Sequence, residues 1–186
     1  MQGLINTPHL KQAFLMTVTR ALIFFGIFLI GCKNNLTKIE VDPTWIKHDL
    51  PYGWTITTPS KFKIGKLQGI DSQVGYISSS GDSILLNYDI GNELVPRNSD
   101  CNFSNEYEHA KLRILSEKEN QSNFRIDTID EKVAIIETPG TKGNGQIRIS
   151  IRDCKTGAWL GINGENLNSE RETLVVKIFQ TIKLDK

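Results

Sequence analysis

The chain has 186 residues, of which 22 are basic and 21 acidic, so its formal net charge at pH 7 is +1. This length is enough for one domain with a substantial hydrophobic core. Because no block of like charge stands out, the sequence does not indicate nucleic acid or anionic lipid headgroups as partners bound by an extended charged surface.

Residues 1–31 predict an export signal. Lys11 and Arg20 form its basic flank, residues 21–30 are apolar, and Gly31 is a small residue of the kind found at cleavage sites. A helix that spans a bilayer needs about 20 apolar residues, and Arg20 prevents extension of the apolar segment upstream. A membrane-spanning helix is therefore not expected.

The end of this segment, Leu29-Ile30-Gly31-Cys32, resembles the lipobox of bacterial lipoproteins. The resemblance implies that the thiol of Cys32 receives a diacylglycerol and that Cys32 becomes the mature N-terminus. Two or more acyl chains anchor a protein stably, so we expect an exported protein attached to the cell membrane or the outer membrane, on a side that the sequence does not specify. The alternative is an ordinary signal peptide in which the cysteine is incidental.

The mature chain is expected to comprise a polar tether, residues 32–49, and a single domain, residues 50–186. With Cys32 assigned to lipid, Cys101 and Cys154 remain, and thiols of exported domains are usually oxidised. Both lie in turn-like sequence, so we predict a disulfide between them, with two free thiols as the alternative. A zinc site is not indicated, because neither cysteine has a closely spaced second ligand.

The first half of the domain predicts three strands and a helix. Residues 52–58 favour a strand ended by Pro59, followed by a loop through Lys66. Residues 73–78 and 83–90 are spaced as a hairpin. An Asx-rich surface loop, residues 92–102, is expected to lead into a helix whose N-cap is Asn105, with Tyr107, Ala110 and Ile114 on one apolar face.

The second half predicts a run of strands and a second helix. Strands are expected at residues 124–129, 133–138, 146–152 and 157–163, and the third alternates isoleucines with polar residues, as a strand with one wet face does. Ser169 and Glu172 predict a capping box for the second helix, and residues 179–184 a closing strand. The expected fold class is α+β, a mostly antiparallel sheet of about six to seven strands packed with two helices.

From Tyr52 to Leu184 this layout resembles the PsbP and Mog1-like fold, which also occurs in small exported lipoproteins of unknown function. The resemblance rests on Gly53-Trp54-Thr55-Ile56 followed by Pro59, the turn Gly69-Ile70-Asp71-Ser72, and the closing segment from Val176 to Lys183. The long insertion around Cys101 departs from the family's layout. Because the family uses the fold mostly in accessory or binding modules, the resemblance implies partners rather than catalysis.

No catalytic, cofactor-binding or metal-binding residue is predicted. Of the histidines, His9 lies in the leader, His48 in the tether and His109 on the first helix, and no Gly-x-Ser-x-Gly sequence presents a nucleophile. Residues 139–145 are glycine-rich but precede a strand, whereas a phosphate loop precedes a helix. Residues 163–168 lack the ligand spacing of a calcium loop.

Aromatic residues on predicted strands belong either to the core or to a binding face; these are Tyr52, Trp54, Tyr76, Tyr88 and Trp159. Asp82-Ser83-Ile84 and Asp127-Thr128-Ile129 resemble a three-residue O-glycosylation signal of exported Bacteroidetes proteins. We expect a lipid-anchored envelope protein that acts as a non-enzymatic accessory or binding module with an envelope protein partner. The alternatives are a lipoprotein that binds a small ligand or glycan, and a carboxylate-dependent envelope hydrolase.

Overall fold

The computed structural model describes residues 41–92, 102–117, 122–141 and 145–185, all within the unit Ile39–Lys186. These residues form ten strands in two antiparallel sheets, together with two α-helices and a short 3₁₀ turn, η1 (Pro51–Gly53). The predicted α+β class, mostly sheet, is therefore confirmed. The leader, Cys32 and most of the expected loop around Cys101 lie outside the described residues.

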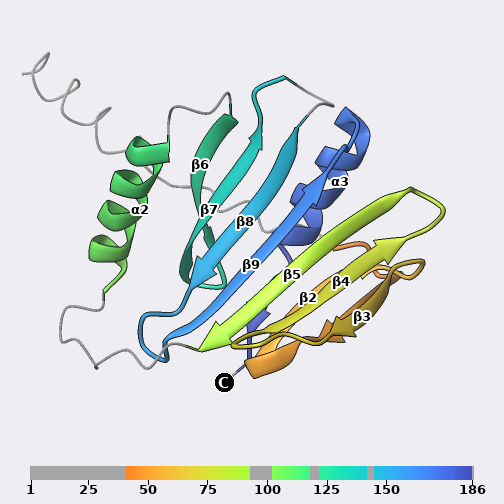
Figure 1. Ribbon diagram of the computed structural model, residues 1–186, viewed down its shortest axis with the longest axis horizontal. Coiled ribbons are helices and arrows are strands. Elements are labelled where there is room, and N and C mark those ends of the chain that lie inside the picture. Colours follow the sequence, from red (N-terminus) through yellow and green to blue (C-terminus); the bar gives the residue numbers. More distant parts are fainter. Residues whose placement is uncertain (1–40, 93–101, 118–121, 142–144, 186) are drawn as a thin grey trace, which may run out of the picture. The chain divides into compact units, whose positions relative to one another are not determined.

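The larger sheet has seven strands, and every neighbouring pair is antiparallel (Figure 1). Its spatial order is β3 (Lys63–Leu67), β4 (Gln73–Ser79), β5 (Ile84–Asn92), β9 (Ala158–Glu165), β8 (Gln146–Arg152), β7 (Lys132–Pro139) and β6 (Ser122–Ile129). The hairpin β4–β5 and the run from β6 to β9 were predicted from local patterns and are confirmed. The long-range pairing of β5 with β9 joins these two parts into one sheet.

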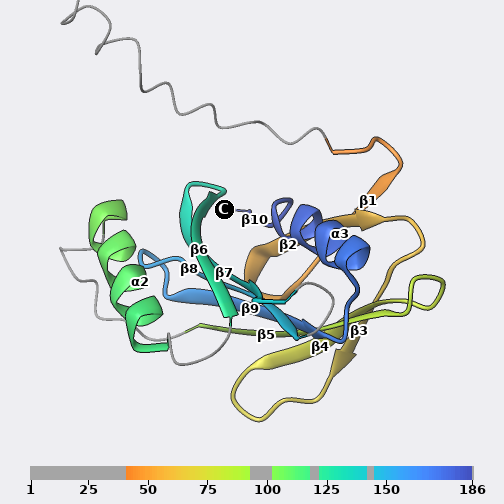
Figure 2. The same ribbon diagram turned by 90° about the horizontal axis from the view of Figure 1, so that it is seen from above.

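The smaller sheet consists of β1 (Trp45–Asp49), β2 (Trp54–Pro59) and β10 (Lys183–Leu184), with β2 in the centre. This sheet and helix α3 (Ser169–Phe179) lie on the same side of the seven-stranded sheet (Figure 2). Helix α2 (Phe103–Glu117) contacts β6 and β7. One face of the central strands is thus covered by α3 and the small sheet, and we call the opposite face the open face.

The core lies between the seven-stranded sheet and its cover of α3 and the small sheet. In β8 the three isoleucines are at most 1% exposed, while Arg148, Ser150 and Arg152 alternate with them on the open face. The fully buried side chains come from both sheets and from α3, and the largest are Trp54, Tyr88 and Phe179. This alternation confirms the prediction of a strand with one wet face.

Three glycines of the large sheet lie opposite aromatic residues on the neighbouring strand. The pairs are Gly65 with Tyr76, Gly75 with Tyr88, and Gly91 with Trp159. In each pair the aromatic side chain occupies the space that a Cβ on the glycine would need, at 2.2 to 2.5 Å. The ring therefore lies directly on the glycine backbone, an arrangement that protects a strand glycine from solvent.

Two strands were missed by the sequence analysis. Residues 45–49, assigned to the tether, form β1, which pairs along its whole length with β2, so the expected domain start at residue 50 is too late. Residues 63–67, assigned to a loop, form the edge strand β3. Both segments are short and carry lysines, which are common on edge strands and weaken the apolar alternation that reveals a strand.

The ends of the helices also differ from expectation. The Oδ1 atom of Asn102 accepts a hydrogen bond from the backbone N–H of Asn105 at 2.9 Å, so the N-cap of α2 is Asn102 rather than Asn105. Asn168, rather than Ser169, caps α3 in the same way. Phe179, expected to begin a strand, is the last residue of α3 and is fully buried, so the closing strand shrinks to Lys183–Leu184, which pairs with β2.

The β6–β7 turn is joined to the C-terminal strand through Asp130. Its Oδ2 atom accepts hydrogen bonds from the backbone N–H of Leu184 and from Nζ of Lys132, both at 3.0 Å. Partial burial disfavours the charged carboxylate, but these two hydrogen bonds and the positive charges of Lys132 and Lys183 together outweigh it and lower the pKa of Asp130 below 3.8. Asp130 therefore links the far edge of the large sheet to the small one.

Candidate ligand-binding site

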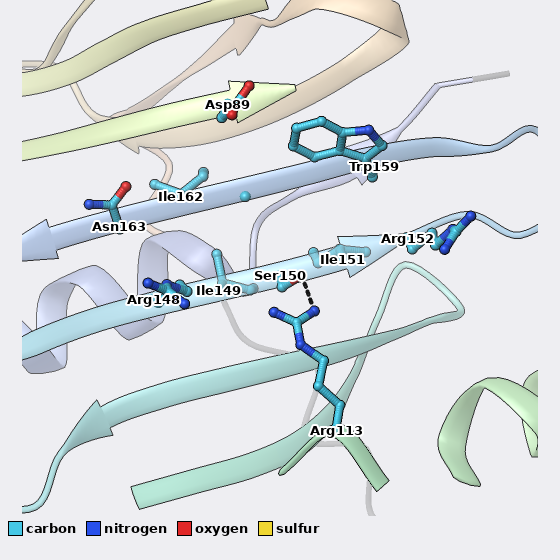
Figure 3. Close-up of a pocket in the computed structure, with 11 residues that line it drawn as sticks. Asp89, Arg113, Arg148, Ile149, Ser150, Ile151, Arg152, Trp159, Ile162 and Asn163 are labelled. Carbon is cyan, nitrogen blue, oxygen red and sulfur yellow. Dashed lines mark hydrogen bonds between the residues drawn. The ribbon is translucent and has the colours of Figure 1, made fainter. Parts of the chain in front are cut away.

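A shallow pocket of about 500 Å³ lies on the open face, over the central strands β5, β9 and β8 (Figure 3). Side chains of these strands line it, and α2 adds Arg113. The isoleucines alternate with these side chains along the strands and are buried toward the core, but Ile149, Ile151 and Ile162 still contribute to the lining, so the pocket wall combines polar groups with apolar surface. Its polar and aromatic side chains are Asp89, Arg113, Arg148, Ser150, Arg152, Trp159 and Asn163.

The strand register arranges the open-face residues of β5, β9 and β8 in three rows that cross the sheet, and all of them except Gly91 and Asn87 line the pocket. The first row is Gly91, Trp159 and Arg152; the second is Asp89, Gly161 and Ser150; the third is Asn87, Asn163 and Arg148. Neighbouring strands lie about 4.8 Å apart, and residues two apart on one strand are separated by about 7 Å. The rows therefore cover an area about 10 Å wide and about 14 Å long.

Gly161 occupies the middle of this area and leaves it hollow. A Cβ added at Gly161 would have only the backbone oxygen of Asp89 within 4 Å, at 3.8 Å, which is an ordinary van der Waals contact. By contrast, the space above Gly91 is filled by the ring of Trp159. The depth of the pocket thus follows from the missing side chain at residue 161.

Positive charge gathers on the side of the pocket formed by β8 and α2. Nη1 of Arg113 donates a hydrogen bond to Oγ of Ser150 at 3.3 Å, which brings the guanidinium from the helix to the strand (Figure 3). Nε of Arg148 lies 3.9 Å from Oε2 of Glu137, a long ion pair at a partly exposed side chain and hence a weak one. The opposite side, on β5, carries the exposed carboxylate of Asp89.

The first turn of α2 is held at the turn between β8 and β9. The carboxylate of Glu106 accepts a hydrogen bond from the backbone N–H of Cys154 and lies near Arg152. Burial nevertheless dominates and raises the pKa of Glu106 above 4.5. This contact fixes the start of the helix that delivers Arg113 to the pocket.

The predicted site residues are placed as follows. Cys154 is disulfide-bonded, but Cys101, the partner that the sequence predicts, and Cys32 lie outside the described residues, so the pairing and the lipidation stay predictions. Nε2 of His48 lies 3.0 Å from Oγ1 of Thr58 on the small sheet, and His109 is exposed on α2. Neither histidine lines the pocket.

Among the predicted aromatic residues, Trp54 and Tyr88 are buried in the core, whereas Trp159 is half-buried in the pocket wall. The described ranges contain no group of three or more His, Cys, Asp or Glu residues arranged to hold a metal ion. Within the same ranges, no helix has the length and apolar composition to cross a membrane.

The sequence analysis missed the arginines of the pocket. The alternation in β8 did place Arg148, Ser150 and Arg152 on one wet face, and that cluster of two arginines around a serine was the available signal. Arg113 and Asp89 could not be added to it, because their approach depends on long-range pairing and on how α2 packs.

No protein-family model matches the chain, and no match is found among curated proteins. The class of site is therefore defined by the geometry alone. Several arginines, one carboxylate and one indole surround an open hollow, and no serine–histidine pair or pair of carboxylates lines it. Such an arrangement can hold a ligand that is at least partly anionic.

Proposed function

We propose that this protein is a lipid-anchored, non-enzymatic binding protein of the cell envelope, and that the pocket on the open face is its ligand site. The observation that carries the proposal is that Arg113, Arg148 and Arg152 all line the pocket that contains the hollow at Gly161. The lipobox resemblance at Cys32 supports the location, and the resemblance to PsbP and Mog1-like proteins supports a binding role.

A small anionic ligand suits the dimensions and the charge of the pocket. Ligand pockets commonly have volumes of about 300 to 1,000 Å³, a range that includes this one. Guanidinium groups bind carboxylates and phosphates through paired hydrogen bonds and keep their charge at any physiological pH. The hydroxyl of Ser150, already held by Arg113, adds a further polar contact on the same side.

Binding is favoured over catalysis by the surroundings of the candidate groups. Oγ of Ser150 contacts the guanidinium of Arg113, which is not a base that could remove its proton. Asp89 is the only carboxylate among the lining residues, whereas a glycosidase of the usual kind needs two on opposite sides of its substrate. A carboxylate-dependent hydrolase thus has the weaker support.

The site is tested by thermal shift and calorimetric titration of the full-length protein in detergent with citrate, inorganic phosphate and galacturonate. At least one anion should raise the melting temperature, and Arg148→Gln should weaken its binding about tenfold or more, because a hydrogen bond to a charged group contributes about 1.5 to 3 kcal/mol. Arg125→Gln is the matched control, since Arg125 is exposed on β6 outside the pocket. Equal effects of the two substitutions would contradict the proposal.

The anchor and the accessory role are tested separately in intact cells. Cross-linked complexes of the native chain and of Cys32→Ala are captured and identified by mass spectrometry. We expect the native chain to fractionate with membranes and to retain an envelope protein that Cys32→Ala loses. Membrane attachment unaffected by Cys32→Ala would rule out lipidation at this residue.

A further inference from the structure

We propose that the ligand of the open-face pocket is an acidic saccharide, one or two sugar rings that bear a carboxylate. This inference deepens the proposed function and rests on it, because it assumes that the pocket binds a ligand. Two observations carry it. Arginines and the carboxylate of Asp89 lie on opposite sides of the pocket, and the indole of Trp159 on β9 lies over the backbone of Gly91 on β5.

The polar groups of the pocket differ from one side to the other. Arginines from β8 and α2 lie on one side, and the exposed carboxylate of Asp89 on the other. A ligand with negative charge along its whole length would be repelled by Asp89. A ligand with an acid at one end and hydroxyls at the other satisfies both sides, since a carboxylate accepts hydrogen bonds from hydroxyl groups.

The amide of Asn163 lies between these sides, on β9, in the row that also contains Arg148. An amide both donates and accepts hydrogen bonds, so it suits a hydroxyl, which does the same. Hydroxyl groups are the commonest polar groups of a sugar. Asn163 and Asp89 therefore form the part of the pocket that fits the neutral portion of a sugar ring.

The indole of Trp159 offers an apolar surface beside these polar groups. One side of the ring lies on the backbone of Gly91, and the side chain is only half-buried. A rigid ring fixed in this way loses little freedom when a ligand contacts it. The C–H groups on one face of a pyranose ring can pack on such a surface while the hydroxyls at its edge reach the strand residues.

The size of the pocket is consistent with this ligand. The three rows of residues cover about 10 Å by about 14 Å, and the hollow at Gly161 leaves space for a ring at the centre.

A nucleotide is the main competitor, because it also combines an anionic group, hydroxyls and a flat ring. Polymeric nucleic acid is not favoured, because it requires an extended basic surface and the net charge of the chain is only +1. A single nucleotide is tested directly by titration.

The test is calorimetric titration of the full-length protein in detergent with galacturonosyl-galactose, its methyl ester, galactobiose, adenosine monophosphate and inorganic phosphate. Galacturonosyl-galactose has one acidic and one neutral ring and should bind at least tenfold more tightly than its methyl ester, which has the same rings without the charge. Asp89→Asn should weaken galacturonosyl-galactose binding about threefold or more and leave phosphate binding unweakened, because only the sugar offers hydroxyls to this residue. Trp159→Ala, and Gly161→Val as a variant that keeps every polar group, should each weaken galacturonosyl-galactose binding at least tenfold.

The outcomes separate this inference from the proposed function. If the methyl ester binds as tightly as the acid, or if adenosine monophosphate binds more tightly than galacturonosyl-galactose, the acidic saccharide is refuted. The proposed function survives either result if Arg148→Gln weakens the ligand that does bind and Arg125→Gln does not. Failure of all five probes to bind, with the protein folded by circular dichroism, would overturn the inference and remove the support for the pocket as a site.

Discussion

Gly91 on β5 and Gly161 on β9 lie in adjacent rows of the same strand pair, yet substitution by valine should affect stability differently at the two positions. At Gly161 the nearest atom to an added Cβ is 3.8 Å away, and the residue does not have a positive φ. Valine is preferred over glycine in strands by up to about 1 kcal/mol. Gly161→Val should therefore leave the free energy of unfolding unchanged or raise it by up to about this amount.

At Gly91 an added Cβ would lie 2.5 Å from the ring of Trp159, so the indole must move. Forcing extra atoms into a packed contact costs about 1 to 3 kcal/mol. For a domain of this size each 1 kcal/mol corresponds to about 2 to 4 °C in melting temperature. Gly91→Val should melt several degrees lower than the native protein, whereas Gly161→Val should melt at the same temperature or slightly higher.

The assay is thermal unfolding followed by circular dichroism, together with titration of the ligand that binds the native protein. Gly161→Val should lose binding without losing stability, because its methyl groups fill the hollow. Gly81→Val is the control, since Gly81 has no atom within 4 Å of an added Cβ and lies outside the pocket. If Gly161→Val destabilises the protein as much as Gly91→Val does, the hollow is not open space and the description of the pocket is wrong.

Three further contacts that hold the site and its sheet can be tested by substitution. Because the pKa of Asp130 is lowered in the folded state, its carboxylate stabilises the fold above pH 4, and this contribution is lost as the pH falls through the folded-state pKa. Asp130→Asn should therefore lower the free energy of unfolding, measured in urea, by about 1 kcal/mol at pH 7 and by less at pH 3. The raised pKa of Glu106 acts in the opposite direction: the contribution of Glu106 to stability is greatest below pH 4.5 and falls as the pH rises above this value. Glu106→Gln should therefore reduce the loss of unfolding free energy between pH 4.5 and pH 7, and an unchanged pH dependence would contradict the burial of this carboxylate. Cys154→Ser should lower the free energy of unfolding by about 4 kcal/mol if the partner is Cys101, given the length of chain between them. Cys101→Ser should then have the same effect as Cys154→Ser, and unequal losses would point to a different partner.

Local patterns predicted most of the large sheet but not its assembly. The hairpin β4–β5 and the strands β6 to β9 have strong alternation or β-branched residues, and each is followed along the chain by its partner. Strand β10 pairs with β2 from the other end of the domain, so the closing strand could be expected from the sequence but its partner could not. Strand β1 directly precedes β2 and was missed because it is short and its apolar alternation is weak. The helices were predicted, but their N-caps were each placed too late in the chain, because Asn102 and Asn168 precede other residues that can also cap.

The pocket was beyond sequence reasoning for the same physical reason. The row formed by Asp89, Gly161 and Ser150 exists only because β5 pairs with β9 and β9 with β8 in one particular register. Arg113 reaches this row from helix α2, which is separated from β8 in the chain by β6 and β7. A pattern within β8 could show that Arg148 and Arg152 share a face, but not what lies across from them.

The glycine–aromatic pairs have a consequence for how the chain folds. They occur at three successive strand interfaces, β3–β4, β4–β5 and β5–β9, and each aromatic side chain fits only opposite a residue without a side chain. A shift of one residue would turn every side chain to the other face of the sheet and remove that fit. The β5–β9 interface joins segments far apart in the chain and should be the slowest to form, because closing a long loop precedes its contacts. The pair Gly91–Trp159 thus fixes a single alignment between the β4–β5 hairpin and the β8–β9 hairpin. Substitution at this pair should slow folding by more than the accompanying loss of stability predicts.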